Sequence, residues 1–147
     1  MPSASISAAG AANGWVQERF LRQRRYLPQL TAGVEAADVI AVSISLTTFQ
    51  EALNDYVTAD EVITLECELF EATGIEAVAA AFTMAETGAG AEVSTTAQAR
   101  LFITTSAAGA AEVSVTDVAT GSGKTMMLKV TPLNVPGFPA FVTITFD

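Results

Sequence analysis

The chain has 147 residues, of which 50% are hydrophobic and 16% are charged, and its formal net charge is −9. This length fits one domain with a sizeable core, and no apolar run approaches the roughly 20 residues that a membrane-spanning helix needs. Histidine is absent and Cys67 is the single cysteine, so the usual general base, the commonest transition-metal ligand and any internal disulfide are missing. We therefore predict a non-enzymatic protein with no catalytic residues, no cofactor and no metal site.

The N-terminal part of the chain differs from the rest in charge. Residues 1–33 hold four arginines and one glutamate, a net charge of +3, whereas residues 34–147 hold three basic and 15 acidic residues, a net charge of −12. We predict an N-terminal arm over residues 1–33 and a sandwich domain over residues 34–147. The arginines follow the small residues of the start, which is the wrong order for a secretory signal peptide, so we expect a protein that is not secreted.

Within the arm, residues 13–28 bring aromatic and basic side chains together. Asn13 is suited to cap a short helix, which must end before Pro28. Tryptophan, tyrosine and arginine contribute most to the energetics of protein interfaces, because they combine large apolar area with directional hydrogen bonds. The predicted partner-binding residues are Trp15, Arg19, Phe20, Arg22, Arg24, Arg25, Tyr26 and Leu27.

Three interpretations of this arm stay open. It grips a neighbouring subunit, it packs back on its own sandwich with its arginines on glutamate-rich strands, or it binds packaged nucleic acid or a membrane. The net charge of −12 on residues 34–147 repels the negatively charged backbone of nucleic acid. We therefore expect protein partners, with no nucleic acid and no membrane.

Seven segments after the arm alternate apolar and polar residues, which is typical of strands with one buried and one solvated face. Short strands divided by glycine-containing turns at 87–90 and 107–109 predict an all-β, two-sheet antiparallel sandwich. The predicted strands are residues 39–46, 61–70, 76–84, 97–105, 111–118, 125–131 and 140–146. In the second of these, Leu65 and Cys67 are in phase and are predicted to be buried. Glu66 and Glu68 take the outer face, where two carboxylates fall short of the six to eight oxygens of a calcium site.

A short helix is predicted between the first two strands. Thr48-Phe49-Gln50-Glu51 has the pattern of a capping box, in which the threonine and glutamate side chains bond to backbone N–H groups at the helix start. Phe49, Leu53 and Tyr56 would then share one helical face. We expect this helix to close one end of the sandwich.

Residues 119–125, ATGSGKT, look like a nucleotide-binding phosphate loop. Such a loop opens a helix whose N-terminus favours the phosphates. Here Pro132 would break a helix within two turns, and Met126, Leu128 and Val130 alternate as in a strand. We interpret the segment as a glycine-rich hairpin loop that joins two antiparallel strands.

The last quarter of the chain, residues 112–147, reads EVSVTDVATGSGKTMMLKVTPLNVPGFPAFVTITFD. A strand with VTDV, a Gly-Ser-rich loop, a strand ending in VTP, a Pro-Gly turn and a closing VTITFD together resemble the terminal strands of bacterial-type immunoglobulin-like domains. Such domains are frequent in tailed-phage virion proteins. The resemblance implies an immunoglobulin-like antiparallel β-sandwich and a surface or assembly module, a class that includes head-decoration (cement) proteins.

The arm and the resemblance together predict a phage head-decoration protein that binds and stabilises the capsid surface. Its partners would be the major capsid protein, other virion subunits and copies of itself in a homo-oligomer, and its location would be the virion after synthesis in the host cytoplasm. A tail-tube or connector component is one alternative. A carbohydrate-binding or adhesion module is another. The chain has two tyrosines and one tryptophan, which provide few rings for stacking on sugars.

Overall fold

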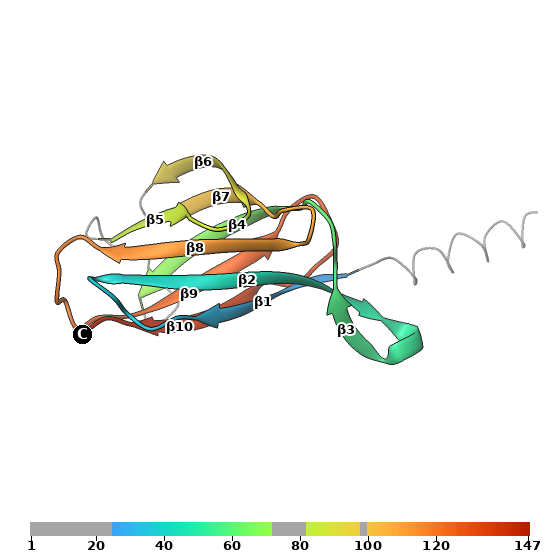
Figure 1. The fold of residues 1–147 in the computed structure, drawn as a ribbon, viewed down its shortest axis with the longest axis horizontal. Coiled ribbons are helices and arrows are strands. Elements are labelled where there is room, and N and C mark those ends of the chain that lie inside the picture. The colour runs from blue at the N-terminus through green and yellow to red at the C-terminus, as the bar shows by residue number, and fades with distance from the viewer. Residues whose placement is uncertain (1–24, 72–81, 98–99) are drawn as a thin grey trace, which may run out of the picture.

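The fold is an all-β sandwich of two antiparallel sheets, seen in a computed structural model that describes residues 25–71, 82–97 and 100–147 (Figure 1). These residues contain no α-helix. The strands are β1 (Tyr26–Ala32), β2 (Val39–Gln50), β3 (Asp55–Thr58), β4 (Thr64–Glu71), β5 (Phe82–Glu86), β6 (Ala91–Ala97), β7 (Arg100–Thr104), β8 (Ala110–Asp117), β9 (Thr125–Pro132) and β10 (Ala140–Thr145).

Each sheet has five strands. One is ordered β1-β2-β8-β5, with β3 paired to the far end of β2, and the other is ordered β10-β9-β4-β7-β6. The inward residues of both sheets form one core, because period-two alternation places every second side chain between the sheets. Leu65, Cys67, Val113 and Leu128 are fully buried there. The alternation of the sequence thus predicted the buried face of β4 correctly.

Six of the seven predicted strands have counterparts at β2, β4, β7, β8, β9 and β10. The seventh predicted strand, at 76–84, is described only from Phe82 onward, where β5 begins. Its residues 76–81 lie outside the described part of the chain. The prediction for the loop at 119–125 was wrong in one respect. β8 pairs with β2 and β5, whereas β9 pairs with β4 and β10, so the loop crosses between the sheets and is no hairpin.

The predicted helix at 48–56 is not formed. Instead β2 continues to Gln50, a single 3-10 turn spans Glu51–Leu53, and β3 runs back along β2. Asn54 closes the reversal in the left-handed conformation, with φ 50°, which asparagine adopts more readily than most residues. Thr47 and Thr48 are buried where β1 and β3 flank β2, so strand pairing outweighs the local capping pattern.

The sandwich begins before the predicted boundary at residue 33. β1 pairs with β2 through seven residue pairs, from Tyr26 opposite Thr48 to Ala32 opposite Val42. Pro28 is tolerated because β1 is an edge strand, where a missing N–H does not interrupt a ladder on both sides. Residues 26–32 were assigned to the arm and belong to the sheet.

The four edge strands of the two sheets differ in how well they are protected against pairing with another chain. β1 contains Pro28, β5 has five residues and ends in Glu86, and β6 has two register shifts along β7. These are the usual features that discourage pairing with another chain. β10 pairs with β9 in an unbroken register and contains neither a charged residue nor a proline.

Candidate interaction surface

The predicted partner-binding residues fall into two groups. Trp15, Arg19, Phe20, Arg22 and Arg24 lie outside the described residues. Arg25 is exposed where the described chain begins, Leu27 is half-buried, and Tyr26 is 7% exposed. Tyr26 therefore belongs to the core of its own sandwich, and assigning it to a partner surface was wrong.

Tyr26 fixes the start of β1 to the opposite sheet. Its N–H donates to the Pro136 carbonyl at 2.9 Å, and its own carbonyl accepts from the Phe138 N–H at 3.0 Å. Between them, Gly137 approaches so closely that a Cβ there would meet the Tyr26 oxygen at 2.6 Å. The Tyr26 hydroxyl donates to the Glu61 carboxylate. The chain thus enters the sandwich at a firmly held point.

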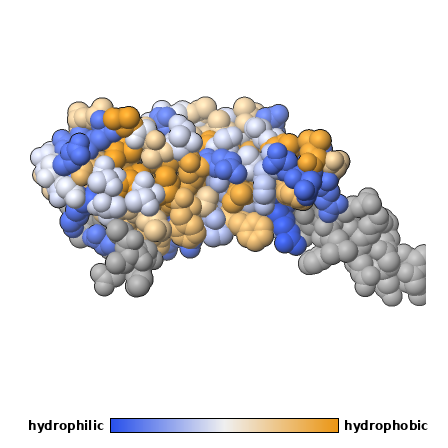
Figure 2. Space-filling model, turned by 90° about the horizontal axis from the view of Figure 1, so that it is seen from below, coloured by the Kyte–Doolittle hydropathy of each residue, from blue (hydrophilic) through white to orange (hydrophobic). Residues whose placement is uncertain are grey.

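Directly beside that point, the hairpin formed by the end of β2, the 3-10 turn and β3 projects beyond the sandwich (Figure 1). The Phe49 N–H donates to the Arg25 carbonyl at 3.4 Å, so the base of the hairpin adjoins the first described residue. The Phe49 and Tyr56 rings contact edge to face, with centroids 5.3 Å apart. Phe49, Leu53 and Tyr56 are 39%, 62% and 36% exposed, and Figure 2 shows apolar surface at this end of the molecule next to hydrophilic surface.

The same end is acidic. Glu51, Asp55 and Asp60 are exposed, and none of them forms an ion pair within the described part of the chain. A groove of ≈ 360 Å³ runs along the base of the hairpin. It is lined by Thr48, Phe49, Gln50, Val57, Thr58, Ala59, Asp60 and Glu61. We call the exposed side chains of Phe49, Glu51, Leu53, Asp55, Tyr56 and Asp60 the hairpin surface.

Sequence reasoning missed the hairpin surface because it assigned Phe49, Leu53 and Tyr56 to one face of a helix. Two local signals favour the hairpin. Asn54-Asp55 is a pair suited to a tight reversal, and Tyr56-Val57-Thr58 consists of residues that favour strands. Both hypotheses place Phe49 and Tyr56 on a common face, but only the hairpin carries them away from the sandwich.

In the GSGKT segment the backbone N–H groups of Gly121 and Ser122 already bind carboxylates of the protein, so they do not point into an open phosphate loop. Asp117 is 1% exposed and accepts hydrogen bonds from the Ala119 and Ser122 N–H groups at 3.1 and 3.0 Å. The Gly121 N–H donates to Asp38 at 3.0 Å. The loop leads into strand β9 and not into a helix, which confirms the strand predicted after Lys124.

Hydrogen bonds also set the ionisation of Asp117. The bond from the Ser122 hydroxyl is the main cause that lowers the pKa of Asp117, and backbone N–H groups of Ser122, Ala119 and Thr120 add to it, while burial acts in the opposite direction. The carboxylate is therefore the stable form, and the loop is wrapped around a fixed negative charge.

The outer face of the second sheet carries an ion-pair network. Arg100 lies 3.3 Å from Glu66 and 3.1 Å from Glu68, and Lys129 lies 3.9 Å from Glu68. Exposed pairs of this kind contribute little stability. No cluster of three or more metal-ligating side chains occurs among the described residues.

On the inner face, burial raises the pKa of the Cys67 thiol to about 12, with a smaller contribution from Glu66, so this thiol stays protonated and unreactive.

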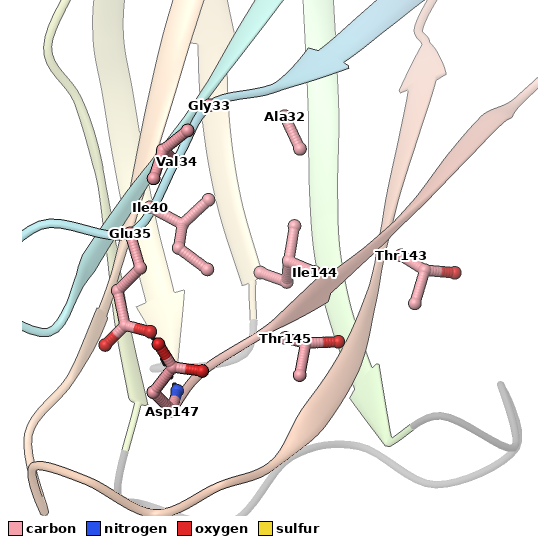
Figure 3. Close-up of a pocket in the computed structure, with 9 residues that line it drawn as sticks. All are labelled: Ala32, Gly33, Val34, Glu35, Ile40, Thr143, Ile144, Thr145 and Asp147. Atoms are coloured by element: carbon pink, nitrogen blue, oxygen red, sulfur yellow. Dashed lines mark hydrogen bonds between the residues drawn. The ribbon is translucent and has the colours of Figure 1, made fainter.

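A second groove, of ≈ 310 Å³, lies between the β1–β2 connection and β10 (Figure 3). Ile40 and Ile144 form its floor, and Glu35 and Asp147 stand at one end. The Asp147 N–H donates to the Glu35 carboxylate at 2.8 Å. Thr143 and Thr145 also line the groove, and the Thr145 hydroxyl is hydrogen-bonded to the Thr125 hydroxyl at 3.1 Å. The described residues also include no helix long and apolar enough to cross a bilayer.

Comparison with known proteins gives no family. No protein-family model matches the chain, and no curated protein is detectably similar to it. Among solved structures, the chain is similar to the GAE domain of GGA2p from Saccharomyces cerevisiae, with a TM-score of 0.32 and 13% sequence identity. The match covers 84% of this chain and 94% of that chain. A likeness this weak carries no argument about function.

Proposed function

We propose that this protein is a non-enzymatic assembly protein, and most concretely a head-decoration protein of a tailed-phage virion. It binds the capsid surface through the N-terminal arm. The observation that carries the proposal is the point at which the described chain begins: Arg25 lies next to a projecting hairpin that exposes Phe49, Leu53 and Tyr56. The point where residues 1–24 join the sandwich and the exposed apolar side chains of the hairpin therefore lie at the same end of the domain, which suits an attachment module.

The strand order supports an immunoglobulin-like architecture for that body. In the constant-type immunoglobulin fold, strands A, B, E and D form one sheet and strands C, F and G the other. Taking β1, β2, β4, β5, β8, β9 and β10 as A to G reproduces the orders A-B-E-D and G-F-C. β3 pairs with the far end of strand B, and β6 and β7 are a pair inserted between D and E that extends the second sheet beyond C.

The arm extends only to residue 24 in this proposal, because β1 starts at Tyr26. Residues 1–24 carry three arginines and one glutamate, a net charge of +2. Residues 25–147 carry four basic and 15 acidic residues, a net charge of −11. Opposite charge on arm and body favours contacts between copies and with acidic capsid surfaces.

Immunogold labelling of phage particles from the source culture, with antibody raised against the purified protein, tests this function. Gold on intact heads is the expected result. Gold on tails or at the head–tail junction would instead favour a tail-tube or connector component, and unlabelled particles would refute a virion role.

A further inference from the structure

We propose that the hairpin surface of one copy is the docking site for residues 15–24 of a second copy. The inference deepens the proposed function, since it rests on the arm as a binding element and names a receptor for it. Three observations carry it: the apolar character of the hairpin, its acidic side chains that make no ion pair with any described residue, and the position at which the described chain begins.

The apolar part of the hairpin surface fits the aromatic side chains of the arm. Phe49 and Tyr56 form an aromatic pair whose rings stay more than one third exposed, and Leu53 at the turn is 62% exposed. An exposed aromatic pair is a platform on which further rings stack or contact edge to face. Trp15 and Phe20 are the aromatic residues of the 15–24 segment.

The charge of the hairpin surface also fits the arm. Glu51, Asp55 and Asp60 make no ion pair among the described residues. The three basic residues that follow β1 in the chain form ion pairs elsewhere. Arg100, Lys124 and Lys129 pair with Glu66, Glu68 and Glu71. The matching positive charge is found in residues 15–24, which hold three arginines against one glutamate.

The length of the arm favours a second copy over the same copy. The hydrogen bond from Phe49 to Arg25 sets Arg25 antiparallel to β2 at the base of the hairpin, so the chain before Arg25 leaves in the direction of the hairpin. The turn at Asn54 is five residues past Phe49, whereas Trp15 precedes Arg25 by ten residues, which span up to roughly 33 Å when extended. An extended arm would therefore carry Trp15 beyond the hairpin of its own copy and leave it available to the hairpin of another. Each copy then gives one arm and receives one, either by reciprocal exchange within a dimer or through a head-to-tail interface that builds rings or filaments.

A mixing experiment with two full-length variants tests the inference. The arm variant carries Trp15→Ala, Arg19→Gln, Arg22→Gln and Arg24→Gln. The surface variant carries Glu51→Gln, Leu53→Ser, Asp55→Asn and Asp60→Asn, all at exposed positions. Sedimentation velocity measures the oligomeric state of the wild type, of each variant alone and of an equimolar mixture. A control variant with Glu66→Gln, Glu68→Gln and Glu71→Gln changes the charge of the protein as much as the surface variant, but on another face.

The wild type and the control variant are expected to self-associate, with affinity at least tenfold weaker at about 500 mM than at about 50 mM salt because exposed charges are screened. Each of the two test variants alone is expected to be monomeric, and their mixture to form heterodimers and nothing larger, because only one intact arm meets one intact surface. A monomeric wild type, or a mixture that stays monomeric, would overturn the inference. Virion labelling is a separate readout, so heterodimers without labelled particles would refute the virion role and leave the docking site standing.

Discussion

Replacing Tyr26 by alanine tests whether the sandwich starts at β1. The side chain is 7% exposed within the core, and large-to-small changes at buried aromatic positions cost about 3–5 kcal/mol through lost burial and the cavity left behind. A domain of this size shifts its melting temperature by roughly 2–5 °C per kcal/mol. Tyr26→Ala should therefore lower the melting temperature, followed by circular dichroism, by roughly 10–20 °C.

Two further variants separate the contributions of Tyr26. Tyr26→Phe keeps the ring and removes the hydroxyl that donates to Glu61, which should cost about 1.5–3 kcal/mol because the acceptor is charged. Gln29→Ala, at an exposed position of the same strand, should stay within about 0.5 kcal/mol of wild type. A melting temperature of Tyr26→Ala within 2–3 °C (roughly 0.5–1 kcal/mol) of wild type would mean that β1 does not hold the sheets together. The predicted boundary between arm and sandwich at residue 33 would then stand.

The remaining predictions concern the core, the GSGKT loop and acid stability. Leu65→Ala should cost about 2–5 kcal/mol in urea unfolding, whereas Glu66→Ala should cost less than about 1 kcal/mol; the reverse order would invert the two faces of β4. ATP should give no binding heat in calorimetry with wild type or Lys124→Ala, and a site lost in that variant would contradict the loop assignment. Since the folded pKa of Asp117 is lowered from 3.8, its stabilisation is present above pH 3.8 and is lost as pH falls through the folded pKa. Urea unfolding across pH 2–6 should show this loss in wild type and a flatter profile in Asp117→Asn, and equal stability of the two proteins at neutral pH would refute it.

The core of the fold could be predicted from sequence because its signal is local. Along β4, apolar residues lie on the buried face and polar residues on the outer face. Leu65, Cys67 and Leu69 are buried as their alternation indicates. The pairing of strands is a different matter, since alternation says nothing about which strand lies alongside. The loop between Asp117 and Thr125 therefore looked like a hairpin, although its two strands lie in different sheets.

The errors at 26–32 and 48–56 share a physical cause. Pro28 was interpreted as the end of a helix, because proline breaks helices. Thr48 and Glu51 were interpreted as the start of another helix, because their spacing is that of a capping box. In the structure the two segments stabilise each other, with Tyr26 opposite Thr48 and Leu27 opposite Thr47. A contact between residues about 20 positions apart is invisible to a local pattern and outweighs it. The hairpin surface depends on that pairing as well as on the local signals at Asn54-Asp55 and Tyr56-Val57-Thr58, which do not by themselves show that β2 continues to Gln50.

The edge strand β10 has a consequence for the behaviour of the protein at high concentration. Its sequence AFVTIT is β-branched and aromatic, uncharged and free of proline, which is the composition that forms cross-β stacks when another chain reaches it. Pro139 and Asp147 flank the segment and act as gatekeepers, since neither residue type extends a stack readily. We therefore expect these flanking residues to limit aggregation through β10. A variant that loosens the contact between Glu35 and Asp147 would lengthen the accessible edge and promote aggregation before the sandwich unfolds.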